Sequence, residues 1–360
     1  MKIKEIKNFK LFLLLICFLI ISLLSIYSFS MFLYSNQYTL VIRQIIFFII
    51  GFLLMFIIKK FDNKNILKYS FIIYTLNICL LIFVLIFGTE KNGIKAWIDL
   101  PFFGSFQPSE FMKIGIILLL SKNALDFEHK KSNFKDEFLF ILKAFIIILI
   151  PGILTFLEPD TGAVFVYIII FIFILFASKL RKRWLILFFI IGFFVLFSVL
   201  FLYFKEKNIF ISIFGSSLFY RLDRLFDWTA SSGMQLENSL IVLGSSGLIG
   251  KGINSIGVYF PEGHTDFIFT SFFSIFGLLG GFILIILFIY FDFYVLNICN
   301  KKSNIYKYIT FGISGILIYQ QIQNISMTMG ILPITGITLP FISYGGSSLI
   351  SYMILLGLLI

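Results

Sequence analysis

The sequence predicts an all-α integral membrane protein with ten transmembrane helices and both termini in the cytoplasm. Of its 360 residues, 59% are hydrophobic and 13% are charged, and the mean hydropathy is +1.03. A soluble domain carries about 25% charged residues, roughly twice this share. No hydrophilic block is long enough to build a separate core, so we expect residues 1–360 to form a single polytopic domain.

The apolar runs give the positions of the ten spans, since a helix needs about 20 apolar residues to cross a bilayer. The first begins like a signal peptide, but its apolar part is too long and lacks a good cleavage site, so we expect it to be retained. The expected spans are residues 10–34, 40–58, 66–88, 107–122, 138–157, 160–178, 184–204, 266–294, 306–332 and 343–360.

The basic residues indicate the orientation. With the N-terminus inside, 19 of the 29 Lys and Arg residues fall in the inner segments, which agrees with the positive-inside rule. These residues form short clusters between spans, so the net charge of +11 does not indicate a nucleic-acid groove. The three cysteines have no metal-like spacing and are expected to be packing residues.

One large extracellular loop, residues 205–265, separates the seventh span from the eighth. Its middle part, about 238–256, is apolar and rich in glycine. This part is too short and too broken to cross the bilayer. We therefore expect it to lie at the membrane surface or to dip in as a re-entrant segment.

The segment that ends this loop, PEGHTDFIF (261–269), carries the strongest candidate for chemistry. Charged groups at membrane depth are rare and mark pathways, partners or reactive sites. Thr265 is a candidate cap for the following helix, but a cap does not explain Asp266. Burial raises a carboxyl pKa and a nearby cation lowers it, so Asp266 is a candidate general base. His264 is a candidate supporting group.

Charged residues at the outer ends of other spans form a second set of candidates. Glu110 and Lys113 lie three residues apart at the start of the fourth span and can pair on one helix face. Asp160 lies in the tight link between spans five and six, and Arg43 near the outer end of span two. The structural alternatives are an ion pair, a hairpin cap and an arginine that snorkels outward. The functional alternatives are binding of an anionic headgroup or a sugar hydroxyl.

Two further groups complete the candidate site. Arg221 and Arg224 in the large loop suit phosphate, or else form a salt-bridge network within the loop. Ser343, Gly345 and Gly346 belong to a stretch rich in Gly, Pro and hydroxyls between the last two spans. Irregular backbone of this kind is tolerated where it lines a wet cavity, and the alternative is a glycine-mediated helix contact.

Four separated stretches, in this order, closely resemble one family, the RodA/FtsW/SpoVE proteins of shape, elongation, division and sporulation. They are FQPSEFMK (106–113), EPDTG (158–162), PEGHTDFIF (261–269) and LPITGITLPFISYGGSS (332–348). The resemblance covers nearly the whole chain. It implies ten membrane helices, polymerisation of peptidoglycan from lipid II, and Asp266 as the catalytic residue. It also implies that Glu110, Lys113 and Asp160 lie in the cavity around Asp266.

Two stretches depart from the family pattern. Residues 271–277 read SFFSIFG where the family usually has a glutamate pair, and residues 234–240 read MQLENSL where a glutamine-rich stretch is common. The stretches IYSFS (26–30) and NISMTMGILPITGI (324–337) favour the RodA type over the FtsW type, whereas ITLPF (337–341) and RLDRLFDW (221–228) favour the division type. The implied partner is a class B penicillin-binding protein, with other proteins of an elongation or division complex.

The implied reaction agrees with the residues. A glycosyl pyrophosphate is already a good leaving group, so a base for the acceptor hydroxyl is the missing part, and attack from the opposite face inverts the anomeric centre. No cofactor is certain, but a divalent cation, Mg²⁺ or Mn²⁺, would help the diphosphate depart, and no resident metal site is expected.

The protein would lie in the bacterial cytoplasmic membrane with its site facing outward. The alternatives are a lipid II flippase, although no inverted repeat is visible, and a non-catalytic scaffold.

Overall fold

The computed structural model describes residues 2–32, 37–91, 93–100, 104–128, 133–214, 219, 233–253, 256–299 and 304–360. The helices are α1 (Lys2–Phe32), α2 (Gln37–Ile58), α3 (Asn63–Lys68), α4 (Ser70–Phe87), α5 (Pro108–Glu128), α6 (Phe134–Leu157), α7 (Thr161–Ala177), α8 (Lys182–Lys205), α9 (Lys207–Phe214), α11 (Gly233–Ser245), α12 (Ile268–Cys299), α13 (Asn304–Thr328) and α14 (Gly346–Gly357). The strands are β1 (Thr89–Lys91), β2 (Ile94–Leu100) and β3 (Gly104–Phe106).

A helix lies at each of the ten positions where a span was predicted. The chain is an all-α multi-pass membrane protein. Within the described residues, α1, α2, α4, α6, α8 and α12 are long and apolar enough to cross a membrane, and α7 and α14 are shorter apolar helices. The remaining two, α5 and α13, are buried along most of their length. Because other helices surround them, they carry polar side chains that lipid would not tolerate.

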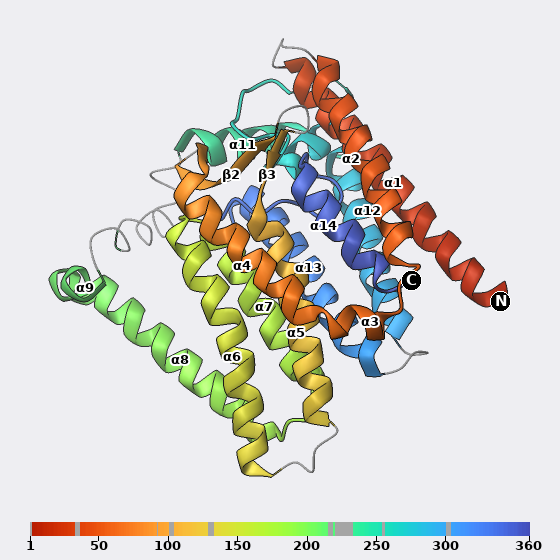
Figure 1. The fold of residues 1–360 in the computed structure, drawn as a ribbon. Helices are drawn as coiled ribbons and strands as arrows, with labels where there is room; N and C mark the ends of the chain where they lie inside the picture. Colours follow the sequence, from red (N-terminus) through yellow and green to blue (C-terminus); the bar gives the residue numbers. More distant parts are fainter. Residues whose placement is uncertain are drawn as a thin grey trace.

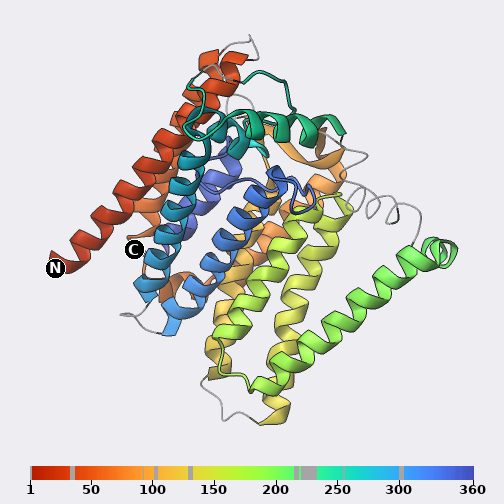
Figure 2. The ribbon, with the colours of Figure 1, turned by 180° about the vertical axis from the view of Figure 1, so that it is seen from behind.

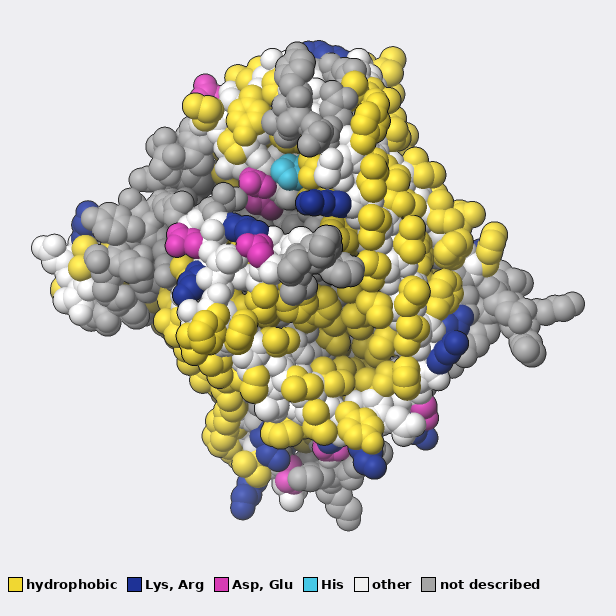
Figure 3. Space-filling view, turned by 45° about the horizontal axis from the view of Figure 1, so that its top comes forward, with side chains coloured by type: hydrophobic (Ala, Val, Ile, Leu, Met, Phe, Trp, Pro, Cys, Tyr) yellow, Lys and Arg dark blue, Asp and Glu magenta, His cyan; other side chains and the backbone are white. Residues whose placement is uncertain are grey.

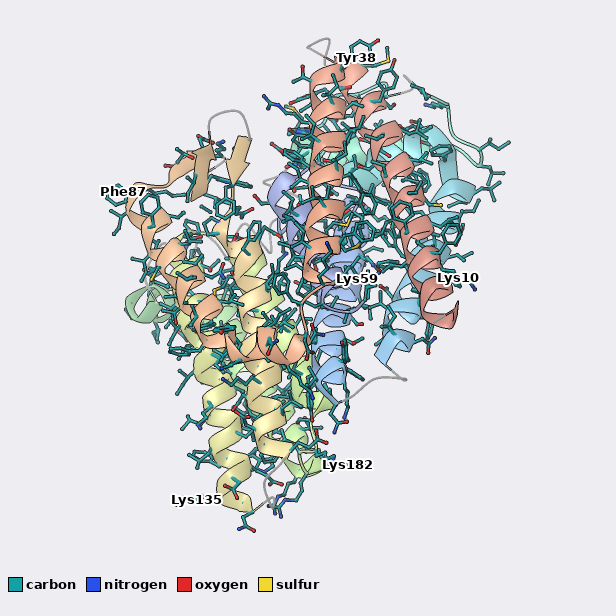
Figure 4. All side chains as sticks on the ribbon, turned by 45° about the vertical axis from the view of Figure 1, so that its right-hand side comes forward. Lys10, Tyr38, Lys59, Phe87, Lys135 and Lys182 are labelled. Carbon is teal, nitrogen blue, oxygen red and sulfur yellow. The ribbon has the colours of Figure 1, made fainter. Side chains whose placement is uncertain are left out.

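The helices form one bundle with α5 and α13 near its middle (Figure 1). α13 packs against α7, α12 and α5, and α14 packs against α2. In the view from behind, α1 runs beside α12, and α8 leans away from the other helices (Figure 2). We call the end that carries the strands and α11 the sheet end. Tyr38 and Phe87 lie toward the sheet end, and Lys135 and Lys182 lie at the opposite end (Figure 4).

Three structural features differ from the prediction. The loop after the third predicted span contains a small antiparallel sheet of order β1-β2-β3, which the sequence patterns did not indicate. The helix of the third span starts later than predicted, because the helical backbone is interrupted at Tyr69 between α3 and α4. Thr265 is not a helix cap: α12 begins only at Ile268, and the Thr265 hydroxyl donates to Glu262 instead.

The apolar part of the large loop packs on the sheet end and does not form a further span. α11 is followed by a loop that pairs with α12 where that helix breaks at Gly277, whose φ is +64°. There the Lys251 amide donates to the Ser274 carbonyl (2.9 Å), and the Leu278 amide donates to the Gly247 carbonyl (3.0 Å). These bonds satisfy backbone groups that the broken helix leaves open, as irregular backbone in a membrane protein requires.

Candidate active site

A cavity of about 490 Å³ opens at the sheet end of the bundle. Its lining comes from α2, the small sheet, α5, α7, the turn before α12, the loop after α13 and the start of α14. Figure 3 shows acidic, basic and histidine side chains gathered around a hollow at this end. The charged residues of the lining are Arg43, Lys91, Glu110, Lys113, Asp160, Glu262 and Asp266.

Asp266 lies in the turn before α12, and its half-buried carboxyl lines the cavity. Burial raises the pKa of Asp266 to about 7, and the nearby carboxylates of Glu262 and Asp160 add to the rise. No described side chain donates a hydrogen bond to the Asp266 carboxylate. The group therefore keeps its oxygen atoms open to whatever enters the cavity, with a pKa in the range where a carboxylate takes up protons near neutral pH.

Asp160 has a structural role in addition to its place in the lining. Its side chain caps α7 by accepting from the Ala163 amide (3.0 Å), and its other oxygen accepts from Gln107 (2.9 Å) and Ser109 (3.2 Å). Burial raises the pKa of Asp160, and the bond from the Ala163 amide opposes the rise. The hairpin-cap interpretation is thus correct. Asp160 is also close enough for its charge to raise the pKa of Asp266.

Glu110 and Lys113 form the predicted ion pair on α5. The Lys113 side chain is 2% exposed, and its ammonium also lies 4.7 Å from the centre of the Tyr352 ring. The Ser351 hydroxyl contacts the Glu110 carboxylate from α14 (3.5 Å). Because Lys113 is buried against Glu110, its positive charge is held at the floor of the cavity.

Arg43 is an exposed residue of α2 that lines the cavity. Among the described residues no carboxylate forms an ion pair with it. The next residue, Gln44, is buried and donates to Ser22 (3.1 Å) and to the Ser343 carbonyl (3.2 Å). Gln44 thereby fixes α2 near the sheet end against the segment before α14 and leaves Arg43 facing the opening of the cavity.

Gly345 and Gly346 line the cavity at the start of α14. A Cβ on Gly346 would stand 2.8 Å from the Phe47 ring, so only glycine lets α14 approach α2 this closely. Both interpretations of this stretch therefore hold: it makes a helix contact, and its backbone borders a cavity.

The remaining predicted residues lie beside the cavity or outside the described part of the chain. His264 stacks on Phe29 (ring centres 5.7 Å apart) and contacts Tyr344 (5.5 Å). Burial lowers the pKa of His264, while Glu262 opposes the decrease. Ser343 lies behind the lining and bonds to backbone. Arg221 and Arg224 lie outside the described residues, so their predicted role stays a prediction.

Three residues with a part in the site were not among the predicted ones. Glu262 lines the cavity, and its charge raises the pKa of Asp266. Its position four residues earlier in the same motif was a usable sequence signal. Gly336 lines the cavity with a φ of +67°. Asn324 donates to the Asp266 carbonyl (2.8 Å) from 58 residues away, a contact that no local pattern reveals.

The described residues contain no group of three or more His, Cys, Asp or Glu side chains that could hold a metal ion. The acids of the cavity instead neutralise Lys113, cap α7 or stand beside one another. A divalent cation, Mg²⁺ or Mn²⁺, that arrives with a diphosphate stays a prediction.

Comparisons with known proteins agree on one family. The family model described as "Cell cycle protein", for FtsW, RodA and SpoVE, matches residues 8–360. The chain is 34% identical over 338 residues to the "Probable peptidoglycan glycosyltransferase FtsW" of Wigglesworthia glossinidia brevipalpis, covering 90% of this chain and 84% of that protein.

Two solved structures share the fold. One is a chain from a peptidoglycan synthase complex that coordinates polymerization and crosslinking, with a TM-score of 0.76 and 24% identity over 98% of this chain and 96% of that one. The other is the rod shape determining protein RodA of Thermus thermophilus, with a TM-score of 0.69 and 24% identity over 97% of this chain and 94% of that one.

Proposed function

Because the chain belongs to the FtsW/RodA/SpoVE family of cell cycle proteins, we propose that it is a peptidoglycan glycosyltransferase that polymerises lipid II in the bacterial cytoplasmic membrane. The name of the FtsW relative supports this activity. The observation that carries the proposal is the Asp266 carboxylate, which lines an open cavity with a pKa of about 7 and no described hydrogen-bond donor.

In the proposed reaction Asp266 is the general base. Its carboxylate takes the proton from the acceptor sugar hydroxyl while that oxygen forms a bond to the anomeric carbon of the donor. The bond from this carbon to the pyrophosphate oxygen breaks, and undecaprenyl pyrophosphate leaves with the bonding electron pair. Attack opposite the leaving group inverts the anomeric centre. A base with a pKa near the working pH suits this step.

The departing diphosphate needs positive charge, and the three cations of the lining differ in their availability. Lys113 is paired with Glu110, and Lys91 is paired with Asp99. Arg43 is exposed and has no ion-pair partner among the described residues. A guanidinium can bind phosphate oxygens through two parallel hydrogen bonds. We therefore assign diphosphate binding to Arg43 and an electrostatic, structural role to Lys113.

The location of the cavity supports a lipid-linked donor. Beside Arg43, the wall contributed by α2 includes the apolar side chains Leu40 and Phe47, which suit the start of a polyprenyl tail. The lysine residues of the opposite end, Lys135 and Lys182, favour the cytoplasm for that end. The site then faces outward, where the growing glycan lies.

The partner we propose is a class B penicillin-binding protein, within an elongation or division complex. The support is that one structure with this fold is a chain of a peptidoglycan synthase complex that couples polymerization with crosslinking. The relatives include both FtsW and RodA proteins. A RodA-like role in elongation stays the favoured prediction, with division as the alternative.

Reconstitution separates this function from its alternatives. The purified full chain is placed in vesicles with fluorescent lipid II, with and without the penicillin-binding partner, and two products are measured: glycan polymer on a gel, and lipid II exposed to an external quencher. Polymer in the vesicles supports the glycosyltransferase. Exchange between leaflets without polymer would indicate a flippase, and neither product, even with the partner, would indicate a scaffold.

A further inference from the structure

The Asp266 carboxylate has no hydrogen-bond donor among the described side chains, so its position depends on the backbone that carries it. A base must be held to within a fraction of an ångström of the proton it removes, and a shift of about 1 Å can lower a rate by roughly 100-fold. Contacts to the backbone must therefore hold the turn before α12 in place.

Three consecutive carbonyl groups of this turn accept hydrogen bonds from the α13–α14 region. The Tyr344 amide donates to the His264 carbonyl (2.9 Å), and the Ser343 hydroxyl donates to the Thr265 carbonyl (2.7 Å). The Asn324 side-chain amide donates to the Asp266 carbonyl (2.8 Å). The turn is thus attached, residue by residue, to segments about 60 to 80 positions later in the chain.

Asn324 makes the bond nearest to the base. Its side chain is fully buried, and its nitrogen also donates to the Ile337 carbonyl (2.7 Å). Both partners are carbonyl oxygens, which only accept, so the amide nitrogen must face them. Ile337 directly follows Gly336, whose Cβ position lies 3.6 Å from the Asp266 Oδ2 atom. One amide group therefore sets the distance between the base and the loop opposite it.

A buried asparagine at this position costs free energy, so packing alone does not explain why the residue is Asn324. The Asn324 Oδ1 atom is buried and has no hydrogen-bond partner in the described part of the chain. An unsatisfied buried acceptor costs about 1–3 kcal/mol. An apolar residue would fill the position without that cost, but it could not bridge two carbonyls.

We infer that Asn324 is a positioning residue for Asp266, assisted by Ser343. This inference depends on the proposed function, since it assigns a role in the same reaction. Asn324 is not itself a lining residue of the cavity and, in this view, does not touch the substrate. It acts by holding the Asp266 backbone and the Gly336 loop at a fixed separation.

Gln323 provides a matched control one residue away. It is also a buried amide of α13, and its side chain donates to the Pro333 carbonyl (2.9 Å) of the same following loop. Its described side-chain hydrogen bond does not reach the turn that carries Asp266. Replacing Gln323 and replacing Asn324 by leucine remove similar buried amides from the same helix, and only the second releases the base.

The experiment measures kcat and KM for lipid II, the pH profile of kcat, and the melting temperature for Asn324→Leu, Gln323→Leu and Ser343→Ala. We expect Asn324→Leu to lose kcat on the order of 100-fold, with KM within about threefold of wild type. Its acid limb should move to lower pH, because water reaches the released carboxyl. Gln323→Leu should match wild type in kcat and pH profile, and Ser343→Ala should lie between the two.

Two results would overturn the inference: wild-type kcat and pH profile in Asn324→Leu, or an equal loss of kcat in Gln323→Leu at an equal melting temperature. Should Asn324→Leu fail to fold, Ser343→Ala, which removes a single oxygen atom, decides by the same readouts. Wild-type protein and Asp266→Asn are measured alongside. If wild type makes no polymer, the proposed function itself fails; if only the variants behave unexpectedly, this inference alone fails.

Discussion

Gly336 and Asp266 come so close together that a Cβ on Gly336 would stand 3.6 Å from the Asp266 Oδ2 atom. The φ of Gly336 is +67°, a conformation that other L-residues adopt only with strain of about 1–2 kcal/mol. The chain thus combines a glycine-only backbone with an open space beside the carboxylate. In the proposed reaction that space holds the acceptor hydroxyl.

Gly336→Ala should therefore lower kcat by roughly tenfold or more, because the methyl group occupies part of the space in which the near-attack geometry forms. Gly330→Ala is the control: Gly330 has a similar φ of +76°, and the nearest atom to its Cβ position is a Leu240 methyl at 3.7 Å. Both variants carry similar strain and should melt at similarly lowered temperatures. Equal kcat values in the two variants would remove the argument for a reserved space at the base.

Arg43→Gln should raise the KM for lipid II by about tenfold, which corresponds to the loss of one hydrogen-bonded charge contact of about 1.4 kcal/mol. Arg43→Lys should recover only part of this loss, because a lysine cannot bind two phosphate oxygens in parallel. The measurement is steady-state polymerisation at varied lipid II, with Lys251→Gln as an exposed control outside the cavity. An unchanged KM in Arg43→Gln would mean that another group binds the diphosphate.

Lys113→Met should destabilise the protein by about 3–5 kcal/mol, because it leaves the Glu110 carboxylate without its partner at the floor of the cavity. The double variant Glu110→Gln with Lys113→Met removes both charges and should regain most of this stability. Thermal unfolding in one detergent compares the three proteins. A single variant as stable as wild type would show that the ion pair does not hold α5 in place.

The pH dependence follows from the raised pKa of Asp266. A general base works in its deprotonated form, so kcat should rise about tenfold per pH unit below pH 7 and level off above it. Glu262→Gln removes a neighbouring negative charge, which lowers the pKa of Asp266 and moves this acid limb to lower pH. Single-turnover rates between pH 5 and 9 locate the acid limb of the wild-type protein and that of Glu262→Gln. A wild-type limb near pH 4, or a shift upward in Glu262→Gln, would contradict this assignment.

The sequence predicted the helices well because lipid imposes a strong and local constraint. Ten apolar runs of suitable length became ten helices, and the acid before α12, the pair on α5 and the acid before α7 line one cavity as expected. The pairing of Glu110 with Lys113 needed only their helical spacing. The helices depend on composition and the ion pair on contacts between near neighbours, whereas the shared cavity was expected from the family resemblance.

What the sequence patterns could not predict depends on contacts between distant residues. The bonds from Asn324 and Ser343 to the turn around Asp266 join segments separated by dozens of positions. The break of α12 at Gly277 is filled by backbone from the loop after α11. The strands β1 and β3, with three residues each, are too short to give a pattern of alternation. Each of these is a tertiary contact with no local sequence signal.

Asp292, toward the other end of α12, provides a control for the assignment of Asp266 as the base. Asp292 of α12 is also a buried acid, but it is hydrogen-bonded to Gln321 (3.2 Å) and does not line the cavity. Asp266→Asn and Asp292→Asn each remove one carboxylate with almost no change of shape. Only the first removes a group that could take a proton from an acceptor sugar.

The decisive measurement is the polymerisation rate of lipid II by these two variants, each folded and present at the same level in the same vesicles. We expect Asp266→Asn to lose kcat by about 10²–10⁴-fold, while Asp292→Asn stays within about threefold of wild type. Polymer formed by Asp266→Asn at the wild-type rate would mean that this carboxylate does not take the proton.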